Sequence, residues 1–311
     1  MAKGKVSAQG RSPVPDSGRE FPGPVPAPFF GAAGVRYWAV SALAVLVGST
    51  LPFWLRPPGF AFSWLHMIEA LVAVVLLQAA AALTRVRVGG DTGAGRQRVG
   101  SPTAPAIACV VVGAAIGLHL NAASPGNLVL ILGVIGIVGG YAYGGRPLLL
   151  SHRGFGEVLV GLCLGVLPVV GAYYVQAHVV SWRVVVASLP LTFAAVLALW
   201  ANEIAWHDRD AAAGKRTLVV LLGKRRAARG VVPLLSVLVF ASLFAAVFTA
   251  SHVPLSLVAV LAFGLARTTV AVFWSRYDEP EALPEAQDAA MKLHLTLGIV
   301  MAGSALAALG A

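Results

Sequence analysis

Charged residues and cysteines are scarce in this chain of 311 residues. Asp, Glu, Lys and Arg make up 12% of it, whereas 58% is hydrophobic, and the mean hydropathy is +0.81. Apolar residues form about half of an ordinary soluble domain, so this composition excludes that class. The two cysteines, Cys109 and Cys163, lie in apolar segments, which favours core packing over a disulfide or a metal pair. The seven histidines are scattered without metal-ligand spacing.

Long apolar segments fill most of the chain instead. A helix that spans a bilayer needs about 20 apolar residues, and the alternating pattern of a membrane barrel is absent. We therefore predict an all-α polytopic membrane protein, with a disordered cytoplasmic tail over residues 1–34 that is rich in Gly, Pro and Ser. Nine transmembrane helices are expected within residues 35–311, at Tyr37–Leu55, Leu65–Leu83, Ala104–Leu120, Leu128–Tyr143, Val158–Val175, Val184–Ala201, Val231–Ala250, Leu255–Val272 and Leu293–Leu309.

The placement of basic residues predicts the orientation. Lys and Arg concentrate in the tail and in the loops after the second, fourth, sixth and eighth spans, whereas the loops on the other side carry only Arg56 and Arg183. By the positive-inside rule the N-terminus is cytoplasmic, and nine spans place the C-terminus outside. The chain is thus expected in the cytoplasmic membrane. The net charge of +10 then indicates topology and affinity for anionic membrane lipid rather than for nucleic acid.

Polar residues cluster in three stretches at predicted cytoplasmic helix ends. They are TRVRVGGDTGAGRQRVG after the second span, YAYGGRPLLLSHRGFGE from Tyr141, and NEIAWHDRDAAAGKRTLVVLLG from Asn202. A helical bundle can bring these ends around one cavity with a basic rim and apolar walls. Such a cavity suits a ligand with an anionic head and a long hydrocarbon tail.

The third stretch combines acids and bases at the membrane boundary, where charge is costly. If the sixth span continues as a helix, Asn202 and Asp210 share a face, and their oxygens suit Mg²⁺ bridging a substrate phosphate. Lys215 can hold phosphate oxygens directly, and Arg153 in the second stretch can do the same. Both stretches also fit ordinary cytoplasmic loops with solvated acids and topology-setting arginines.

Two of these polar stretches resemble motifs of a known protein family. The third stretch resembles the second aspartate motif of the UbiA superfamily of intramembrane prenyltransferases, closest to the branch of the 1,4-dihydroxy-2-naphthoate polyprenyltransferases. The segment YGGRPLLLSHRGFGEVLVGLCLGVLPVVGAYYVQ resembles the same branch's segment with an Arg-Gly-x-Gly-Glu core and a final Tyr-Tyr-x-Gln run. The resemblance covers the chain from about Tyr37 onward.

The resemblance implies a helical bundle around a lipid-accessible cavity, where Mg²⁺ binds a prenyl diphosphate whose allylic cation alkylates a small aromatic acceptor. Carried over by position, it implies Mg²⁺ ligation by Asn202, Asp210 and Asp91, and catalytic roles for Asp210, Asp91 and Asp208. The diphosphate contacts that it implies are Lys215, Arg153 and Arg146, and Arg85 is a further candidate contact because of its charge.

The chain departs from the family pattern at expected carboxylates. Ala81, Ala82 and Arg85 stand where the first motif has an Asn and two aspartates, and Trp206 stands at the first aspartate of the second motif. In one account, Arg85 and other basic residues supply part of the missing cationic charge. In the other account, the protein binds a prenyl lipid without ionising a diphosphate.

Two further functions stay open beside prenyl transfer to an aromatic or quinone-precursor acceptor. Trp206 and His207 fit a cation-stabilising wall, as in a UbiA-type terpene cyclase, although Trp206 also fits an interfacial belt. A transporter is the remaining alternative. Glu69 has no obvious partner, and the acidic run from Tyr277 to Asp288 is expected to be a solvated loop.

Overall fold

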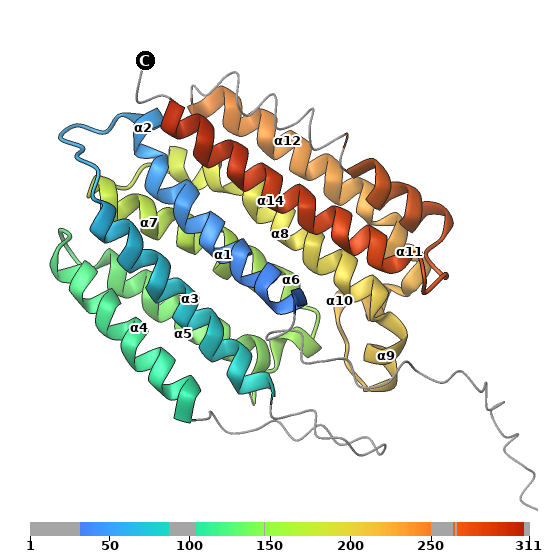
Figure 1. The fold of residues 1–311 in the computed structure, drawn as a ribbon. Helices are drawn as coiled ribbons and strands as arrows, with labels where there is room; N and C mark the ends of the chain where they lie inside the picture. Colours follow the sequence, from blue (N-terminus) through green and yellow to red (C-terminus); the bar gives the residue numbers. More distant parts are fainter. Residues whose placement is uncertain (1–31, 87–103, 146, 250–263, 265, 308–311) are drawn as a thin grey trace, which may run out of the picture.

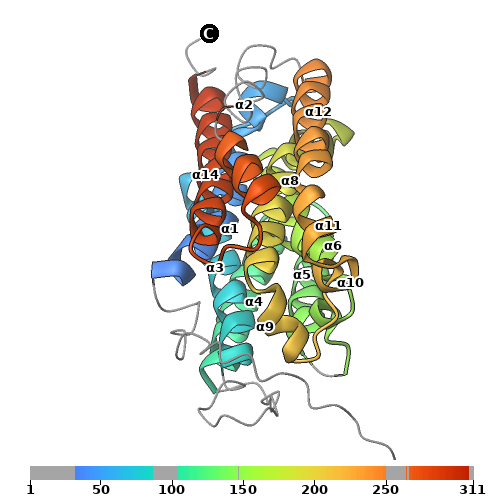
Figure 2. The same cartoon turned by 90° about the vertical axis from the view of Figure 1, so that its right-hand side faces the viewer.

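The structure, a computed structural model, describes residues 32–86, 104–145, 147–249, 264 and 266–307, and every regular element within them is a helix. Figure 1 shows these helices as one elongated bundle, and Figure 2 shows the same bundle from the side. The elements are α1 Ala32–Thr50, α2 Pro52–Leu55, α3 Trp64–Val86, α4 Ala104–Ala122, α5 Leu128–Gly144, the 3₁₀ turn η1 Leu150–His152, α6 Gly156–Val160, the π-helical η2 Gly161–Val166, α7 Leu167–Ala177, α8 Trp182–Ala205, α9 His207–Ala212, α10 Leu218–Leu222, α11 Lys224–Arg229, α12 Val231–Thr249 and α14 Leu283–Ala307. Residues 264 and 266–275 are also helical.

Most of the predicted spans are confirmed. Within the described residues, seven helical segments are long and apolar enough to cross a membrane. They are Trp38–Leu55, Trp64–Leu83, Ala104–Ala122, Gly156–Ala177, Trp182–Ala205, Lys224–Thr249 and Leu283–Ala307. The predicted fourth span is the shorter apolar helix α5, and most of the predicted eighth lies outside the described residues. The expected count of nine therefore stays a prediction.

Helix α8 forms the middle of the bundle. It packs against α12 and α14 on one side and against η2 and α7 on the other (Figure 1). Ala187, Ala194 and Ala201 recur every seven residues along α8 and are fully buried, so small side chains line one of its packed faces and let neighbouring helices approach closely. In contrast, α3 and α4 expose large apolar side chains such as Leu65, Ile68 and Val111. Such a surface is stable against lipid and costly in water.

Three boundaries differ from the predictions. An unbroken helix from Asn202 to Asp210 is wrong, because α8 ends at Ala205, Trp206 has φ −98° and ψ 6°, and α9 begins at His207. The prediction of a loop from Tyr277 to Asp288 is wrong in its second half, because α14 begins at Leu283. Helix α1 begins at Ala32, inside the predicted tail, whose residues 1–31 lie outside the described part.

Polar side chains secure the loops at the end of the bundle opposite α9. Gln176 bonds both backbone groups of Ser63, accepting from its N–H at 2.9 Å and donating to its carbonyl at 2.8 Å. The Tyr174 hydroxyl donates to the Pro125 carbonyl. The Tyr-Tyr-x-Gln run thus joins α7 to two loops and stabilises the structure at this end of the bundle. Glu69, for which the sequence offered no partner, lies 3.4 Å from His119.

Candidate active site

Two loops that are distant in sequence meet at the α9 end of the bundle. The Arg216 N–H donates to the His152 carbonyl at 3.2 Å. Gly154, at φ +76°, brings its backbone against Leu221, where a β-carbon would lie 3.3 Å from the leucine Cδ1. The second and third polar stretches therefore adjoin, as predicted. The first stretch lies outside the described residues from Arg87 onward, and Asp91 and Arg146 are also outside them.

Lys215 and Asp210 form an ion pair within this junction. The Lys215 Nζ lies 2.6 Å from Asp210 Oδ1, and the side chains are 26% and 13% exposed. The same two residues are also joined through the backbone, where the Lys215 N–H donates to the Asp210 carbonyl at 2.9 Å. Gly214 makes this return possible because its φ of +72° is readily adopted only without a side chain. Two predicted site residues thus form one partly buried pair.

Other predicted residues bond different partners. Asn202 Oδ1 accepts a hydrogen bond of 3.0 Å from Gln287 on α14. The exposed Arg153 guanidinium donates to the Pro147 carbonyl at 3.3 Å. Arg85 lies near the end of α3, but its side chain is outside the described part.

Asp208 belongs to a surface group of charges. Its carboxylate lies 2.8 Å from His207 Nδ1 and 3.2 Å from Lys224 Nζ, and its side chain is 62% exposed. The hydrogen bond with His207 and then the contacts with Lys224 hold the pKa of Asp208 below its usual value. Asp208 therefore interacts with α11, whereas Asp210 interacts with Lys215.

The Trp206 side chain has a cationic neighbour from the chain itself. The Arg209 guanidinium carbon lies 5.1 Å from the centre of the Trp206 ring. Such a cation–π contact at a partly exposed position is worth about 0.5–1 kcal/mol. One face of Trp206 therefore meets Arg209, an arrangement that suits an interfacial tryptophan.

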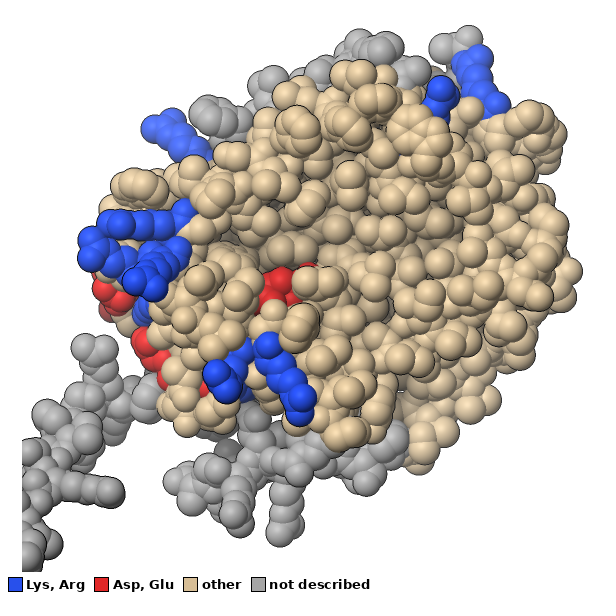
Figure 3. All heavy atoms as spheres, turned by 180° about the vertical axis from the view of Figure 1, so that it is seen from behind, with Lys and Arg blue, Asp and Glu red and all other residues tan. Residues whose placement is uncertain are grey.

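Sequence reasoning missed two acidic residues of this site, Glu157 and Glu203. Their relative exposures are only 6% and 5%, and their carboxyl groups lie within hydrogen-bonding reach of each other. Asp210 and Lys215 lie within electrostatic range of Glu203. Figure 3 shows acidic atoms recessed among uncharged ones on this face, with Lys and Arg side chains nearby. Both glutamates stood in the two quoted stretches, and the signal that marked them was an acid at the end of an apolar span.

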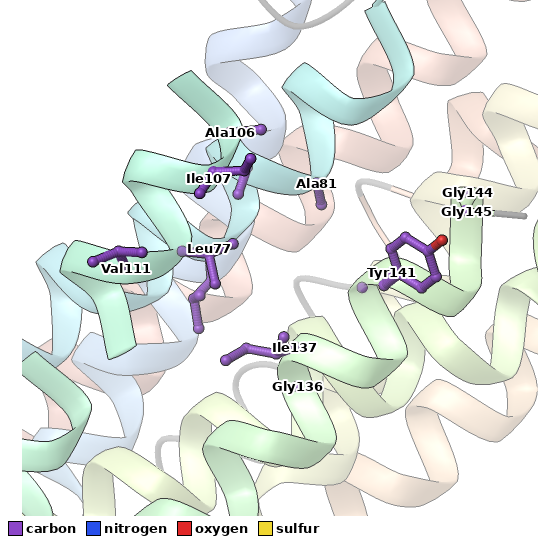
Figure 4. Close-up of a pocket in the computed structure, with 13 residues that line it drawn as sticks. Leu77, Ala81, Ala106, Ile107, Val111, Gly136, Ile137, Tyr141, Gly144 and Gly145 are labelled. Carbon is purple, nitrogen blue, oxygen red and sulfur yellow. The ribbon is translucent and has the colours of Figure 1, made fainter. Parts of the chain in front are cut away.

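An apolar pocket of about 300 Å³ lies between α3, α4 and α5 (Figure 4). Ala81, at a carboxamide position of the first family motif, lines it together with Tyr141, Gly144 and Gly145. The opposite face of α5 approaches η2, where a β-carbon at Gly139 would lie 2.7 Å from Cys163 Sγ. Helix α5 therefore separates this pocket from the helices that carry the glutamates. The single cavity with a basic rim that the sequence suggests stays a prediction.

Comparison with known proteins identifies the family. The model of the UbiA prenyltransferase family matches residues 94–296. The chain belongs to the UbiA prenyltransferase family. It is 29% identical over 122 residues to a 1,4-dihydroxy-2-naphthoate octaprenyltransferase of Bacillus subtilis, a match that covers 39% of each chain. It is 28% identical over 164 residues to a 2-carboxy-1,4-naphthoquinone phytyltransferase of Synechocystis, which covers 52% of this chain and 53% of the relative. The chain thus matches about half or less of the length of these relatives.

The fold of this UbiA family member also matches solved structures. A UbiA homolog from Archaeoglobus fulgidus bound to GPP and Mg²⁺ aligns with a TM-score of 0.54 and 16% identity, over 86% of this chain and 99% of that one. The predicted family, the all-α polytopic fold and the integral membrane character are therefore confirmed.

Proposed function

We propose that this UbiA family member transfers a prenyl group from a prenyl diphosphate to an aromatic or quinone-precursor acceptor within the membrane. The observation that supports it most directly is the junction of the two loops, which gathers Lys215, Asp210, Glu203 and Glu157 where apolar helices end. The named relatives are naphthoate and naphthoquinone prenyltransferases. We retain the cytoplasmic membrane and a cytoplasmic N-terminus as parts of this proposal, because the basic residues surround α9 to α11.

Basic side chains would hold the head of the substrate. Lys215 carries three donor hydrogens, and its Nζ can bond a phosphate oxygen while staying near Asp210. Among the described residues, the Arg153 guanidinium donates to the Pro147 carbonyl, and its other N–H groups can bond a phosphate oxygen besides the one held by Lys215. Arg146 and Arg85 remain proposed contacts of the same diphosphate. These donors would counter the negative charge of the leaving group.

The reaction needs one bond to break and one to form. The allylic carbon–oxygen bond breaks with its electron pair on the diphosphate, and the allylic carbon then bonds the aromatic ring, which loses a proton. Asp210 pairs with Lys215 through Oδ1, so its Oδ2 is the atom that we assign to receive that proton. The catalytic roles of Asp91 and Asp208 stay predictions, and Asp208 in this structure faces Lys224.

Mg²⁺ is the proposed cofactor, and bound Mg²⁺ would neutralise charge on the diphosphate. Of its predicted ligands, Asn202 accepts from Gln287 through its single side-chain oxygen, whereas Asp210 pairs with Lys215 through one of its two oxygens. Buried carboxyl oxygens of Glu157 and Glu203 have no hydrogen-bond donor among the described residues. Carboxylate oxygens are hard ligands of the kind that Mg²⁺ prefers, so the residues at this site fit the ion.

A protein that binds a prenyl lipid without turning it over is the second candidate. It is favoured by Ala81, which places a methyl group in an apolar pocket wall where the family motif has a polar side chain. The apolar pocket would then hold the hydrocarbon tail.

The test is to incubate the purified protein in lipid nanodiscs with prenyl diphosphates of several lengths and dihydroxynaphthoate. Proposed transfer requires released diphosphate together with a prenylated product, and chelation with EDTA should abolish both until Mg²⁺ is restored. Lys215→Met is expected to lower kcat/KM about 10- to 100-fold, the effect of losing one charge-assisted hydrogen bond of about 1.5–3 kcal/mol. The exposed Lys292 on α14 provides the control Lys292→Met, which should leave kcat/KM unchanged.

Other products would contradict transfer. Released diphosphate with a cyclic hydrocarbon or terpene alcohol would indicate a cyclase. Tight binding of a prenyl diphosphate without any release would support the second candidate.

A further inference from the structure

The glutamate pair, Glu157 and Glu203, is buried without a compensating donor in the part of the chain that the structure describes. Both oxygens of Glu157 and Oε2 of Glu203 have no hydrogen-bond donor among the described residues, although each residue is at least nine-tenths buried. Burying an unpaired carboxylate costs several kcal/mol, and two carboxylates in contact also repel each other. Such a pair is stable when the two carboxyl groups share a proton or when a bound cation neutralises them.

Close helix packing forces the two carboxyl groups together. Glu157 lies in the first turn of α6, and Glu203 lies in the last turn of α8. The π-helical η2 that continues α6 meets α8 through two glycines. A β-carbon at Gly161 would lie 3.2 Å from Val196 Cγ2, and one at Gly165 would lie 2.7 Å from Thr192 Cα. The glutamate pair is therefore held by rigid elements and not by a mobile loop.

Among the described residues, the charges that act on the glutamate pair leave an excess of negative charge when all the carboxyl groups are ionised. Asp210 and Lys215 are the other described ionisable groups that act on Glu203. Among the described residues, the Lys215 ammonium acts on Glu203 and its Nζ is already 2.6 Å from Asp210. A single divalent cation would balance the remaining charge when all three carboxyl groups are ionised.

The ligand atoms select the class of cation. Oxygen is the only donor element that the glutamate pair offers, which suits hard ions such as Mg²⁺ or Mn²⁺ and not the sulfur and imidazole preferences of Zn²⁺. Within the described residues, no group of three or more His, Cys, Asp or Glu side chains could hold a metal ion. Mg²⁺ commonly uses one or two carboxylates and completes its shell with water and substrate phosphates. A site with two carboxylates is consistent with this usual coordination of Mg²⁺.

We propose that Glu157 and Glu203 bind a divalent cation of the Mg²⁺ class, in a chain that has Ala82, Arg85 and Trp206 at carboxylate positions of the two family motifs. The proposal deepens the proposed prenyl transfer, because a cation here would lie beside Lys215 and could bridge to the diphosphate. The chain would then keep one cation site at the glutamate pair despite the substitutions at the motif positions.

Cation binding can be measured without turnover. The probe is Mn²⁺, added to the full-length purified protein in nanodiscs of uncharged lipid, with free Mn²⁺ counted by electron paramagnetic resonance and with Mg²⁺ as competitor. Wild type should bind one Mn²⁺ that Mg²⁺ displaces. Glu157→Gln and Glu203→Gln should each weaken that binding about tenfold or more, because each removes a charged ligand and retains the side-chain shape. Glu285→Gln makes the same change at an exposed position on α14 and should leave the affinity unchanged.

Stability separates lost ligands from lost folding. Without cation, both Gln variants should unfold at a temperature no lower than wild type, because they remove an unsatisfied buried charge. If a Gln variant fails to fold, the corresponding Asp variant keeps the charge and moves the oxygens, and weaker Mn²⁺ binding is again expected.

Two results would overturn the cation assignment: no Mn²⁺ binding to wild type, or equal binding by wild type and both Gln variants. Prenyl transfer that persists with such a result would leave the proposed function standing and remove only this site. Mn²⁺ binding that depends on both glutamates, without transfer from any prenyl diphosphate, would support the cation site and refute the transferase.

Discussion

Substitution of Gly165 by Ala probes the helix contact that holds the glutamate pair. Gly165 lies in η2, and its missing side chain lets that segment touch α8 at Thr192. A methyl group there would lie 2.7 Å from Thr192 Cα and 2.8 Å from Thr192 Cβ, distances that real β-carbons do not adopt. Thr192 has little room to yield, because it is 8% exposed and its hydroxyl donates to the Ser188 carbonyl at 2.9 Å. The two helices must therefore move apart.

The expected cost follows from that overlap. Overpacking of a close contact costs about 1–3 kcal/mol, and Ala regains about 0.5–1 kcal/mol of helix propensity. The overlap involves the α8 backbone itself, so we expect the first effect to win and the melting temperature to fall by several degrees. Gly117 on α4 is the control, because a β-carbon there meets nothing within 4 Å. Gly117→Ala should leave the melting temperature unchanged or raise it slightly.

The assay is thermal unfolding in one detergent, followed by Mn²⁺ titration of both variants. Because η2 continues the helix that carries Glu157, moving it away from α8 should weaken Mn²⁺ binding in Gly165→Ala and not in Gly117→Ala. A Gly165→Ala protein with the melting temperature and Mn²⁺ affinity of wild type would refute the reasoning. It would show that the contact between η2 and α8 neither limits stability nor positions the glutamate pair.

Two further predictions concern residues outside the glutamate pair. Gln176→Leu removes both side-chain hydrogen bonds to the Ser63 backbone and should lower the free energy of unfolding by about 1–3 kcal/mol while leaving kcat unchanged; a matched melting temperature would contradict this. His207 and Lys224 lower the pKa of Asp208 below its ordinary 3.8, so this ion pair stabilises the fold above that pH and is lost as the pH falls through the folded value. Asp208→Asn should therefore cost about 1 kcal/mol or less in melts at pH 7 and nothing below the folded pKa, and a cost that persists in acid would contradict the pairing.

The spans were predictable because hydrophobic length is a local property. The prediction of Ala104–Leu120 differs from the observed α4 by two residues at one end. The start of α14 was predicted ten residues late, at Leu293, because Glu285 and Asp288 interrupt the apolar run. A helix depends on backbone hydrogen bonds and continues through polar residues beyond the apolar region, so hydropathy alone underestimates its length.

The site was only partly predictable. Convergence of the second and third stretches followed from topology, since both join helices at the same end of the bundle. The partner of each side chain did not follow. Asn202 and Glu203 are consecutive, yet Asn202 bonds Gln287 on α14 while Glu203 faces Glu157 on α6. Neighbours in a helix point about 100° apart, so a small uncertainty in the rotation of α8 exchanges their surroundings.

The sequence by itself determined that the chain is a helical membrane protein with sequence motifs of a UbiA prenyltransferase. Both features can be recognised in consecutive residues, as the length of apolar segments and as short motifs. Only the tertiary structure decided which acids meet. Glu157 and Glu203 become a pair because Gly161 and Gly165 let η2 approach α8 more closely than any side chain permits. That contact depends on the fit between the surfaces of η2 and α8. Neither segment of sequence predicts this fit by itself.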